Sequence, residues 1–196
     1  MKLLSAVAWL IAVVAIAAVA YLAVTPAAPN AYAVYQDATE RLASVRPPAA
    51  GSPAETAALE RVTGFFNTMS IDTVTKQTRR VYARDAVLSD TLAVIRGHAA
   101  IEAYYTKTAE QADEVSIEIL NVIRQGDDYF LRWRMQVRHP AIADGEPLVS
   151  FGMTHVRLNE AGEIALHYDF WDSAAGFFDY VPGIGSALRR IRSRIH

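Results

Sequence analysis

The chain has 196 residues, of which 52% are apolar and 20% charged, and its formal charge at pH 7 is −2. Its length favours one compact domain with an appendage, because domains average about 150 residues, and its composition excludes a disordered or collagen-like chain. The lack of cysteine excludes a disulfide framework, a thiol nucleophile and cysteine-ligated metal. Residues 47–182 hold 12 basic and 19 acidic residues, so no nucleic acid partner is expected, because phosphate backbones are bound by clustered Lys and Arg.

The amino-terminal part of the chain is strongly apolar. From Leu3 to Val24 every residue except Ser5 is apolar, and a helix of that length would span about 33 Å, enough for a hydrocarbon core of roughly 30 Å. Residues 1–24 are therefore expected to form a transmembrane anchor, with a cleaved signal peptide or a buried core helix as alternatives. Because Lys2 precedes the run, the positive-inside rule places the domain on the periplasmic or extracytoplasmic side of the membrane. Cleavage would make the domain a secreted one.

Two further segments flank the predicted domain. Residues 25–53 are rich in Ala and Pro and are expected to form a linker. Within it, apolar residues recur at helical spacing over 31–45, which predicts a short amphipathic helix on the surface of the domain or the membrane. Residues 173–196 are expected to form a loop and then a basic amphipathic helix. That helix is either a contact for anionic lipid headgroups or a solvated helix end.

The domain itself, residues 54–172, begins with helical patterns. Ser52-Pro53-Ala54-Glu55 predicts a helix start, with the serine as N-cap and the glutamate completing a capping box. Apolar residues in phase predict a second helix from Ile71 and a third after a turn at Gly97. A short strand is expected between them, around Ala86–Asp90.

After Asp113 the apolar period changes from 3.6 to 2, which predicts strands. A shift of phase indicates a β-bulge near Ile119 and Leu120. The turn at Gly126-Asp127 leads into a strand with one apolar and one basic face. This turn would set Trp133 opposite Leu120.

The last two predicted strands, Leu148–Leu158 and Glu163–Trp171, form a hairpin. A three-residue loop, Glu160–Gly162 with glycine in the left-handed conformation, is a common way to join them. Three helices with a short strand, followed by four long antiparallel strands, predict an α+β fold. In it the helices pack on one face of a curved antiparallel sheet.

The expected register of this hairpin brings polar residues together. It sets His155 opposite His167 and Met153 opposite Asp169, so that His155, His167, Asp169 and Trp171 share one face of the sheet. A slip of one residue would separate them.

Three residues are candidates for acid–base chemistry: Asp90, His155 and Asp169. Asp90, at the end of a short strand beside apolar residues, is placed either to take a proton from carbon or to satisfy a loop. His155 and Asp169 form either an acid–base pair, in which the carboxylate orients the imidazole, or a hydrogen-bonded decoration of the sheet. With His167 they could also form a two-histidine, one-carboxylate metal triad. The favoured interpretation involves no metal and no cofactor.

Further side chains are candidates for an apolar ligand pocket, although core packing explains most aromatic residues. The candidates are Tyr82, Tyr104, Trp133, Met135, Phe151, Met153, His167 and Trp171.

The pattern resembles a known superfamily over about residues 54–172. Tyr82-Ala83-Arg84-Asp85-Ala86-Val87-Leu88-Ser89-Asp90, then Ile95-Arg96-Gly97-His98-Ala99-Ala100-Ile101 and Tyr104-Tyr105, is similar to the front half of nuclear transport factor 2-like proteins. These include SnoaL-like polyketide cyclases and ketosteroid isomerases. Leu158-Asn159-Glu160-Ala161-Gly162-Glu163-Ile164 followed by His167-Tyr168-Asp169-Phe170-Trp171-Asp172 resembles their closing hairpin.

The resemblance implies a cone-shaped α+β barrel that holds a hydrophobic ligand and is frequently dimeric through the sheet. By this resemblance Asp90 matches the general base of the isomerases, and His155 and Asp169 match a His and an Asp used by the cyclases. The oxyanion-hole tyrosine and the protonated aspartate of the isomerases fall near Val62 and Thr154, which are poor replacements. A steroid isomerase is therefore not expected.

Together these features predict a membrane-tethered SnoaL-like domain that binds a small apolar molecule and catalyses proton transfer, such as cyclisation or isomerisation. The alternative is a non-catalytic ligand-binding or protein-association module of the same fold, and a homodimer is compatible with both. Asp90, His155 and Asp169 around one cavity would favour the enzyme. Their separation onto different faces would favour the module.

Overall fold

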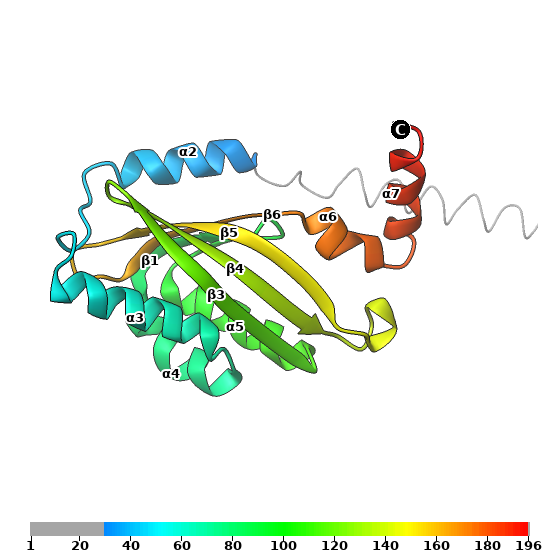
Figure 1. Ribbon diagram of the computed structural model, residues 1–196, viewed down its shortest axis with the longest axis horizontal. Coiled ribbons are helices and arrows are strands. Elements are labelled where there is room, and N and C mark those ends of the chain that lie inside the picture. The colour runs from blue at the N-terminus through cyan, green and yellow to red at the C-terminus, as the bar shows by residue number, and fades with distance from the viewer. Residues whose placement is uncertain (1–29, 196) are drawn as a thin grey trace, which may run out of the picture. The chain divides into compact units, whose positions relative to one another are not determined.

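The computed structural model describes residues 30–195 (Figure 1). The chain divides into two units, Met1–Val34 and Tyr35–His196, and the sheet and its packed helices belong to the second. In chain order the elements are α2 (Ala31–Arg41), α3 (Pro53–Asn67), α4 (Ile71–Val81), β1 (Tyr82–Ser89), β2 (Val94–Arg96), α5 (His98–Gln111), β3 (Glu114–Gln125), β4 (Asp128–Arg138), η1 (Ala143–Gly145), β5 (Leu148–Leu158), β6 (Ile164–Trp171), α6 (Ser173–Gly176), η2 (Phe178–Tyr180) and α7 (Ile184–Arg192).

The predicted transmembrane segment, residues 1–24, lies outside the described residues. Within residues 30–195, none of the helices combines the length and the apolar character needed to cross a bilayer. Helix α2 lies within the predicted linker, and α7 lies within the predicted basic tail.

Six strands form a single sheet in the order β2-β1-β6-β5-β4-β3. Neighbouring strands are antiparallel except β1 and β6, which run parallel. The α+β class is therefore confirmed, but the sheet is mixed rather than wholly antiparallel. The difference arises because the meander β3–β6 returns its last strand to the edge of β1, a pairing that alternation along the chain does not reveal.

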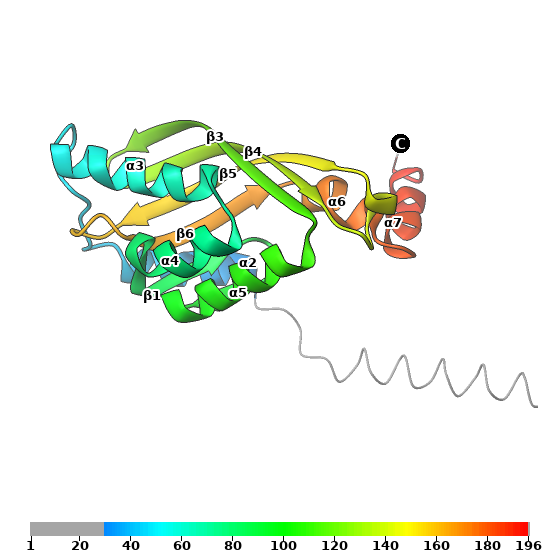
Figure 2. The same cartoon turned by 90° about the horizontal axis from the view of Figure 1, so that it is seen from below.

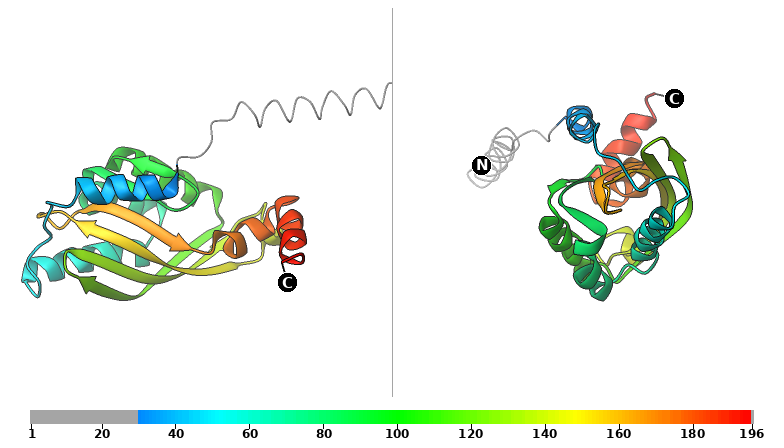
Figure 3. Two further views of the ribbon diagram at one scale, coloured as in Figure 1. Left: turned by 90° about the horizontal axis from the view of Figure 1, so that it is seen from above. Right: turned by 90° about the vertical axis from the view of Figure 1, so that its left-hand side faces the viewer.

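The core lies between the sheet and helices α3, α4 and α5 (Figure 1 and Figure 3). The face of the sheet turned toward these helices is called the inner face, and it carries Leu131, Val156 and Leu158, each at most 1% exposed. Part of the opposite, outer face is covered by α2, where the ring of Tyr35 contacts those of Tyr168 and Phe170 at centroid distances of 5.0 and 5.8 Å.

The first helix of the core begins as predicted. Ser52 is its N-cap and accepts a hydrogen bond from the backbone N–H of Glu55 at 3.1 Å, with proline at the first helical position. The carboxylate of Glu55 does not close a capping box with Ser52. It accepts instead from the Gly51 N–H at 2.6 Å, from the Tyr129 hydroxyl at 2.7 Å and from Arg124. The hydrogen bond from Tyr129, foremost among these contacts, lowers the pKa of Glu55. This glutamate therefore ties α3 to β3 and β4.

The bulge predicted in β3 is confirmed, with a one-residue correction to the pairing. The register against β4 shifts between Ile119 and Asn121, which leaves Leu120 as the extra residue. Trp133 consequently lies opposite Ile119, not opposite Leu120 as expected.

For the closing hairpin, the predicted loop is confirmed but the predicted register is wrong. Gly162 has φ +74°, as the predicted three-residue loop requires, and Leu158 pairs with Ile164. The next pair is Arg157 with Leu166, so Ala165 is an extra residue in β6.

This one-residue shift of register determines which side chains of the hairpin share a face of the sheet. Val156 pairs with His167, His155 with Tyr168, and Thr154 with Asp169. The prediction that His155 lies opposite His167 is therefore wrong, and the same slip places Met153 opposite Phe170 instead of Asp169. His155 and Asp169 consequently lie on opposite faces of the sheet.

The chain beyond β6 forms short helical elements at the end of the sheet (Figure 2). Asp179 in η2 forms an ion pair with Arg192 of α7, and its backbone oxygen accepts from Arg189 at 3.1 Å. Gly185 allows this close packing, because a Cβ there would lie 1.9 Å from the backbone oxygen of Asp179. Two of the four tail arginines are thus bound to the domain's own η2.

Candidate functional site

Polar and aromatic side chains from four strands, one helix and one loop converge on the inner face. Because the slipped register turns alternate residues of β5 and β6 inward, it brings Thr154, His167 and Asp169 to the same side as residues of β1 and α5. We call this set the inner cluster. Its members are Tyr82, Asp90, Tyr104, Tyr105, Trp133, Thr154, His167, Asp169 and Trp171.

Asp169 is the centre of the inner cluster. Its Oδ1 accepts from the Thr154 hydroxyl at 2.5 Å and from Nε2 of His167 at 3.0 Å. Thr154 in turn accepts from the indole N–H of Trp133 at 2.9 Å, which orients its hydroxyl hydrogen toward the carboxylate. Among the described residues, none donates to Oδ2 of Asp169, whose side chain is 14% exposed. One oxygen is therefore fixed, and the other has free lone pairs.

A relay of hydroxyls supports His167 from the other side. Its Nδ1 lies 2.8 Å from the hydroxyl of Tyr82, which is 3.0 Å from the hydroxyl of Tyr105. Because ionised Asp169 can only accept at Nε2, the neutral imidazole has its proton there and accepts from Tyr82 at Nδ1. Burial raises the pKa of Tyr82 and of Tyr105 well above the ordinary tyrosine value, so both are neutral donors. The two tyrosines of the relay therefore add no negative charge next to Asp169.

Asp90 is held differently. Its Oδ1 accepts from the backbone N–H groups of Leu92 at 3.0 Å and Ala93 at 2.8 Å, and its Oδ2 accepts from the Tyr104 hydroxyl. These bonds hold a tight turn in which Thr91 has φ +71°. Both carboxylate oxygens accept hydrogen bonds. Of the two interpretations of Asp90, this agrees with the one in which its side chain holds the loop, and not with the one in which it is a free base.

The two carboxylates nevertheless face the same tyrosines. Burial is the main cause that raises the pKa of Tyr104 and Tyr105, and the negative charges of Asp90 and Asp169 raise both further. The indole N–H of Trp171 also donates to the backbone oxygen of Asp90 at 2.9 Å. Asp90 and Asp169 therefore belong to one arrangement.

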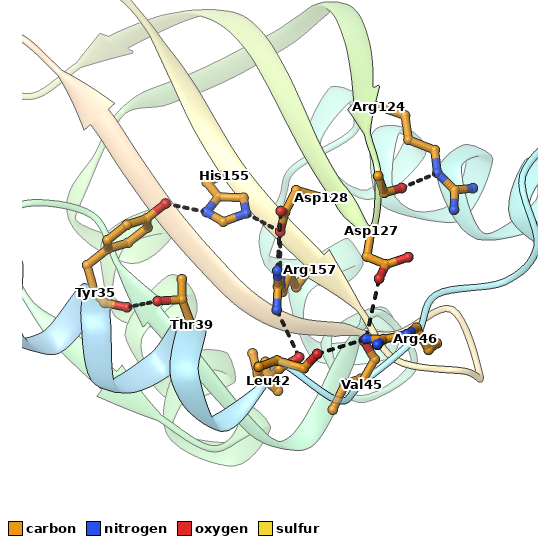
Figure 4. Close-up of polar contacts among 12 residues, drawn as sticks. Tyr35, Thr39, Leu42, Val45, Arg46, Arg124, Asp127, Asp128, His155 and Arg157 are labelled. Atoms are coloured by element: carbon orange, nitrogen blue, oxygen red, sulfur yellow. Dashed lines mark hydrogen bonds and ion pairs between the residues drawn. The ribbon is translucent and has the colours of Figure 1, made fainter.

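His155 lies in a second arrangement on the outer face (Figure 4). Its Nδ1 is 3.0 Å from the Tyr35 hydroxyl, its Nε2 is 2.8 Å from Oδ1 of Asp128, and the ring of Phe130 stacks on it at 4.9 Å. Arg157 donates to both oxygens of Asp128, at 2.5 and 3.3 Å. We call Tyr35, Asp128, His155 and Arg157 the outer cluster.

In the outer cluster the guanidinium of Arg157 forms an ion pair with the carboxylate of Asp128. Burial alone would raise the pKa of Asp128, but hydrogen bonds from Arg157 and His155 outweigh it and hold that pKa below its ordinary value. Arg157 also donates to the backbone oxygen of Leu42 at 2.8 Å, just beyond the end of α2. The outer cluster therefore ties α2 to the sheet.

The predicted pairing of His155 with Asp169 is not formed, because Ala165 slips the register. Of the three acid–base candidates, Asp90 and Asp169 lie together, but His155 lies on the opposite face, which by the criterion stated above favours the non-catalytic module. The same slip excludes the two-histidine metal triad, since its histidines lie on opposite faces. Across residues 30–195, no three His, Asp or Glu side chains form a group that could hold a metal ion.

The predicted pocket residues divide between the faces. Phe151 and Met153 lie on the outer face and are 78% and 37% exposed. The others lie on the inner side: Tyr82, Tyr104, Trp133, Met135, His167 and Trp171.

Two open hollows of the described surface lie elsewhere. One of 490 Å³ is lined by Arg61, Lys76, Gln77 and Arg80, and one of 280 Å³ lies between the loop after β4 and Pro182. Neither includes a residue of the inner cluster. Tyr104, Asp169 and Trp171 of the inner cluster are partly rather than fully buried.

Sequence reasoning did not single out Thr154 and Tyr105 for the site. Thr154 carried a weak signal, because it shares its phase of β5 with the apolar Val156 and Leu158 but also with the polar Ser150. Tyr105 carried none beyond its neighbour Tyr104, since helical spacing alone assigns either ring to the core.

Comparison with solved structures defines the class of fold. An NTF2-like protein of unknown function from Exiguobacterium sp. 255-15 is 16% identical, with a TM-score of 0.50 over 59% of this chain and 98% of that one. A protein assigned to the SnoaL-like polyketide cyclases, from Jannaschia sp. CCS1, is 17% identical, with a TM-score of 0.51 over 64% and 96%. An LEH-like epoxide hydrolase from M. tuberculosis is 14% identical, with a TM-score of 0.50 over 72% and 96%. Such identities define the fold as NTF2-like and nothing finer.

The family follows from the sequence. The profile of the SnoaL-like domain matches residues 59–167, more than half of the chain. The chain therefore belongs to the SnoaL-like domain family, as its resemblance predicted. A search of curated proteins finds no match.

Proposed function

We propose that this SnoaL-like domain binds a small apolar molecule at the inner cluster and moves a proton to or from it, with Asp169 as the acid–base group. The observation that carries the proposal is the asymmetry of this carboxylate. Its Oδ1 is fixed by Thr154 and His167, while its Oδ2 has no donor among the described residues. A base needs such an oriented carboxylate with an open lone pair.

The surroundings suit an apolar substrate with an activated C–H bond. The rings of Trp133 and Trp171 lie 6.4 Å apart at their centroids, and Phe66 packs 5.6 Å from His167. Aromatic walls exclude water and strengthen the interaction of a carboxylate with an acidic C–H group. Cyclisation and isomerisation next to a carbonyl are reactions of this class.

Other members of the inner cluster position these groups. Thr154 and His167 hold the plane of the Asp169 carboxylate, and Asp90 holds the hydroxyl of Tyr104. Because both oxygens of Asp90 are occupied, we assign it a positioning role rather than that of a second base.

The proposal is tested with a chromogenic carbon acid, a nitrobenzisoxazole, and full-length protein. In the reaction a base takes the C–H proton, the C–H electron pair forms a nitrile, the N–O bond breaks and a coloured cyanonitrophenolate leaves. We expect faster turnover than with acetate at equal concentration, and a loss of about 100-fold or more in Asp169→Asn.

Equal turnover by wild type and Asp169→Asn would contradict the catalytic role. No turnover, together with an apolar molecule detected by native mass spectrometry of the purified protein, would instead support the non-catalytic ligand-binding alternative.

A second candidate function is association of two copies through the outer face. This face carries exposed apolar side chains next to α2, with Phe170 opposite Met153 across the strand pair. The exposed residues are Val149, Phe151, Met153 and Phe170. Such contiguous apolar surface is typical of an interaction site. Light scattering of the full-length protein and of Phe151→Ser tests it: a dimer that the substitution weakens supports association, and a monomeric wild type opposes it.

We also propose that the domain is tethered to a membrane through residues 1–24 and that α7 adds a lipid contact. Arg190 and Arg194 have no carboxylate partner within residues 30–195 and are available to lipid headgroups. Retention in the membrane pellet after an alkaline wash supports the anchor, whereas recovery of a shortened soluble chain supports cleavage. Unchanged association with anionic vesicles after deletion of 186–196 would exclude the contact through α7.

A further inference from the structure

We propose that the hollow formed by α3 and α4 is a binding site for a phosphate-bearing ligand. It is lined by Arg61 of α3 and by Lys76, Gln77 and Arg80 of α4, and its volume is 490 Å³. Sites for small molecules commonly enclose about 300–1,000 Å³. The hollow shares no residue with the inner cluster, so this inference does not depend on the proposed proton transfer.

The lining has an excess of positive charge. Within residues 30–195, neither Arg61 nor Arg80 forms an ion pair with a carboxylate. Lys76 pairs with Asp72 at 2.6 Å, but both side chains are about 70% exposed, so the pair contributes little. Lys76 and Arg80 are also one turn apart on α4, where like charges repel. A bound anion would remove this repulsion.

Arg61 is held in place by backbone contacts rather than by a counter-ion. One Nη donates to the backbone oxygen of Gly162 at 2.7 Å, in the turn between β5 and β6. That turn approaches α3 so closely that a Cβ on Gly162 would lie 2.6 Å from the Cβ of Ala58. The guanidinium is therefore fixed beside the hollow before any ligand arrives, which lowers the entropic cost of binding.

The same guanidinium carries an unsatisfied donor. Nε of Arg61 is buried and has no acceptor among the described residues. Buried donors are almost always hydrogen-bonded, so the hydrogen bonding of Arg61 is incomplete without a ligand. Guanidinium groups match the geometry of phosphate oxygens, and the amide of Gln77 supplies a further donor.

The neighbouring residue Arg79 provides a matched control. It carries the same charge on the same helix but points to α5, where its Nε donates to Glu102 at 2.7 Å. Arg79 does not line the hollow. A general attraction of anions to α4 would involve Arg79 and Arg80 alike. The proposed site includes Arg80 but not Arg79.

The test is calorimetric titration of full-length protein in a neutral detergent with two soluble probes. Pyrophosphate represents a free phosphate compound, and glycerophosphoglycerol represents the phosphodiester of a lipid headgroup. We expect at least one probe to bind with a Kd below about 1 mM, and Arg80→Gln and Lys76→Gln to weaken it about tenfold each. Arg79→Gln should change the Kd less than about twofold.

The outcomes identify the source of the phosphate and test whether the site exists. Binding of pyrophosphate alone assigns a soluble phosphate compound, and binding of glycerophosphoglycerol alone assigns a lipid headgroup. Arg61→Lys keeps the charge but loses the guanidinium fork, and an expected weakening of about tenfold tests that contact without removing the cation. No binding of either probe, or equal weakening by Arg79→Gln and Arg80→Gln, would overturn the proposal.

Discussion

The two faces of the sheet carry the same trio of side chains in different electrostatic settings. On each face a tyrosine hydroxyl lies near Nδ1 of a buried histidine, at 2.8 Å inside and 3.0 Å outside, and an aspartate lies near Nε2, at 3.0 and 2.8 Å. The inner trio is Tyr82, His167 and Asp169, and the outer trio is Tyr35, His155 and Asp128.

What differs is the fourth residue. Outside, Arg157 neutralises Asp128 and occupies both of its oxygens. Inside, the neutral Thr154 takes the corresponding place and leaves Oδ2 of Asp169 without a donor among the described residues. A compensated carboxylate is a structural tie, while an uncompensated one next to aromatic rings is available for chemistry. The comparison shows that the hydrogen-bond pattern alone does not distinguish the histidine of the proposed site from a structural one.

The largest expected effect separates the two histidines. His167→Gln should lower turnover of the nitrobenzisoxazole about 100-fold, because the carboxylate of Asp169 loses its orientation. His155→Gln, the matched change on the outer face, should alter turnover less than about twofold. A reversed order in steady-state rates would assign the chemistry to the outer cluster.

Arg157 provides the next effect, on stability. Arg157→Gln should lower the free energy of unfolding by about 2 kcal/mol, because a hydrogen-bonded and partly buried carboxylate loses its cation. Urea unfolding measures this, with Arg41→Gln as control. Arg41 pairs with Asp37 on the exposed side of α2 and should contribute about 0.5 kcal/mol or less. Equal losses in the two variants would show that the outer cluster is an ordinary surface pair.

The pH dependence of stability sharpens the contrast further. In the unfolded chain Asp128 has its ordinary pKa of 3.8, whereas hydrogen bonds from Arg157 and His155 overcome burial and lower the pKa in the folded protein. Its contribution is therefore complete above that ordinary value and is lost as pH falls through the folded value. Urea titrations between about pH 5 and pH 2 should show a steeper loss for wild type than for Asp128→Asn. Parallel losses would mean that this carboxylate is not stabilised by folding.

The smallest effect concerns the attachment of α2. Tyr35→Phe removes one hydrogen bond to His155 and should lower the free energy of unfolding by about 1 kcal/mol. Tyr180→Phe, on an exposed ring, serves as the control and should change it by a few tenths of a kcal/mol. Indistinguishable unfolding curves for the two variants would remove Tyr35 from the tie.

Local signals allowed much of the fold to be predicted from the sequence. The cap at Ser52, the bulge at Leu120 and the left-handed Gly162 each depend on residues adjacent in the chain, and each is confirmed. The register beyond Gly162 was not predictable in this way. Ile164, Ala165 and Leu166 are all buried, because β6 is a central strand, and a continuous apolar run conceals an extra residue.

The candidate site was predicted only in part, again because the extra residue in β6 was not foreseen. Asp169 lies on the inner face, as the hypothesis required, but its histidine partner is His167 rather than His155. The true partners of His155 are Tyr35 of α2 and Asp128 at the start of β4, the strand next to β5. Tyr35 lies 120 residues before His155, and no spacing rule connects such distant segments, so only the packing of α2 on the sheet reveals this contact.

The central claim is that Asp169 serves chemistry and Asp128 serves structure, and one crossed measurement tests it. Turnover and the free energy of unfolding are determined side by side for Asp169→Asn and Asp128→Asn. We predict that Asp169→Asn loses turnover about 100-fold with unfolding unchanged within about 0.5 kcal/mol, and that Asp128→Asn does the reverse, losing about 1–2 kcal/mol of stability. If both variants lose turnover equally, or if only Asp128→Asn loses it, the account is contradicted.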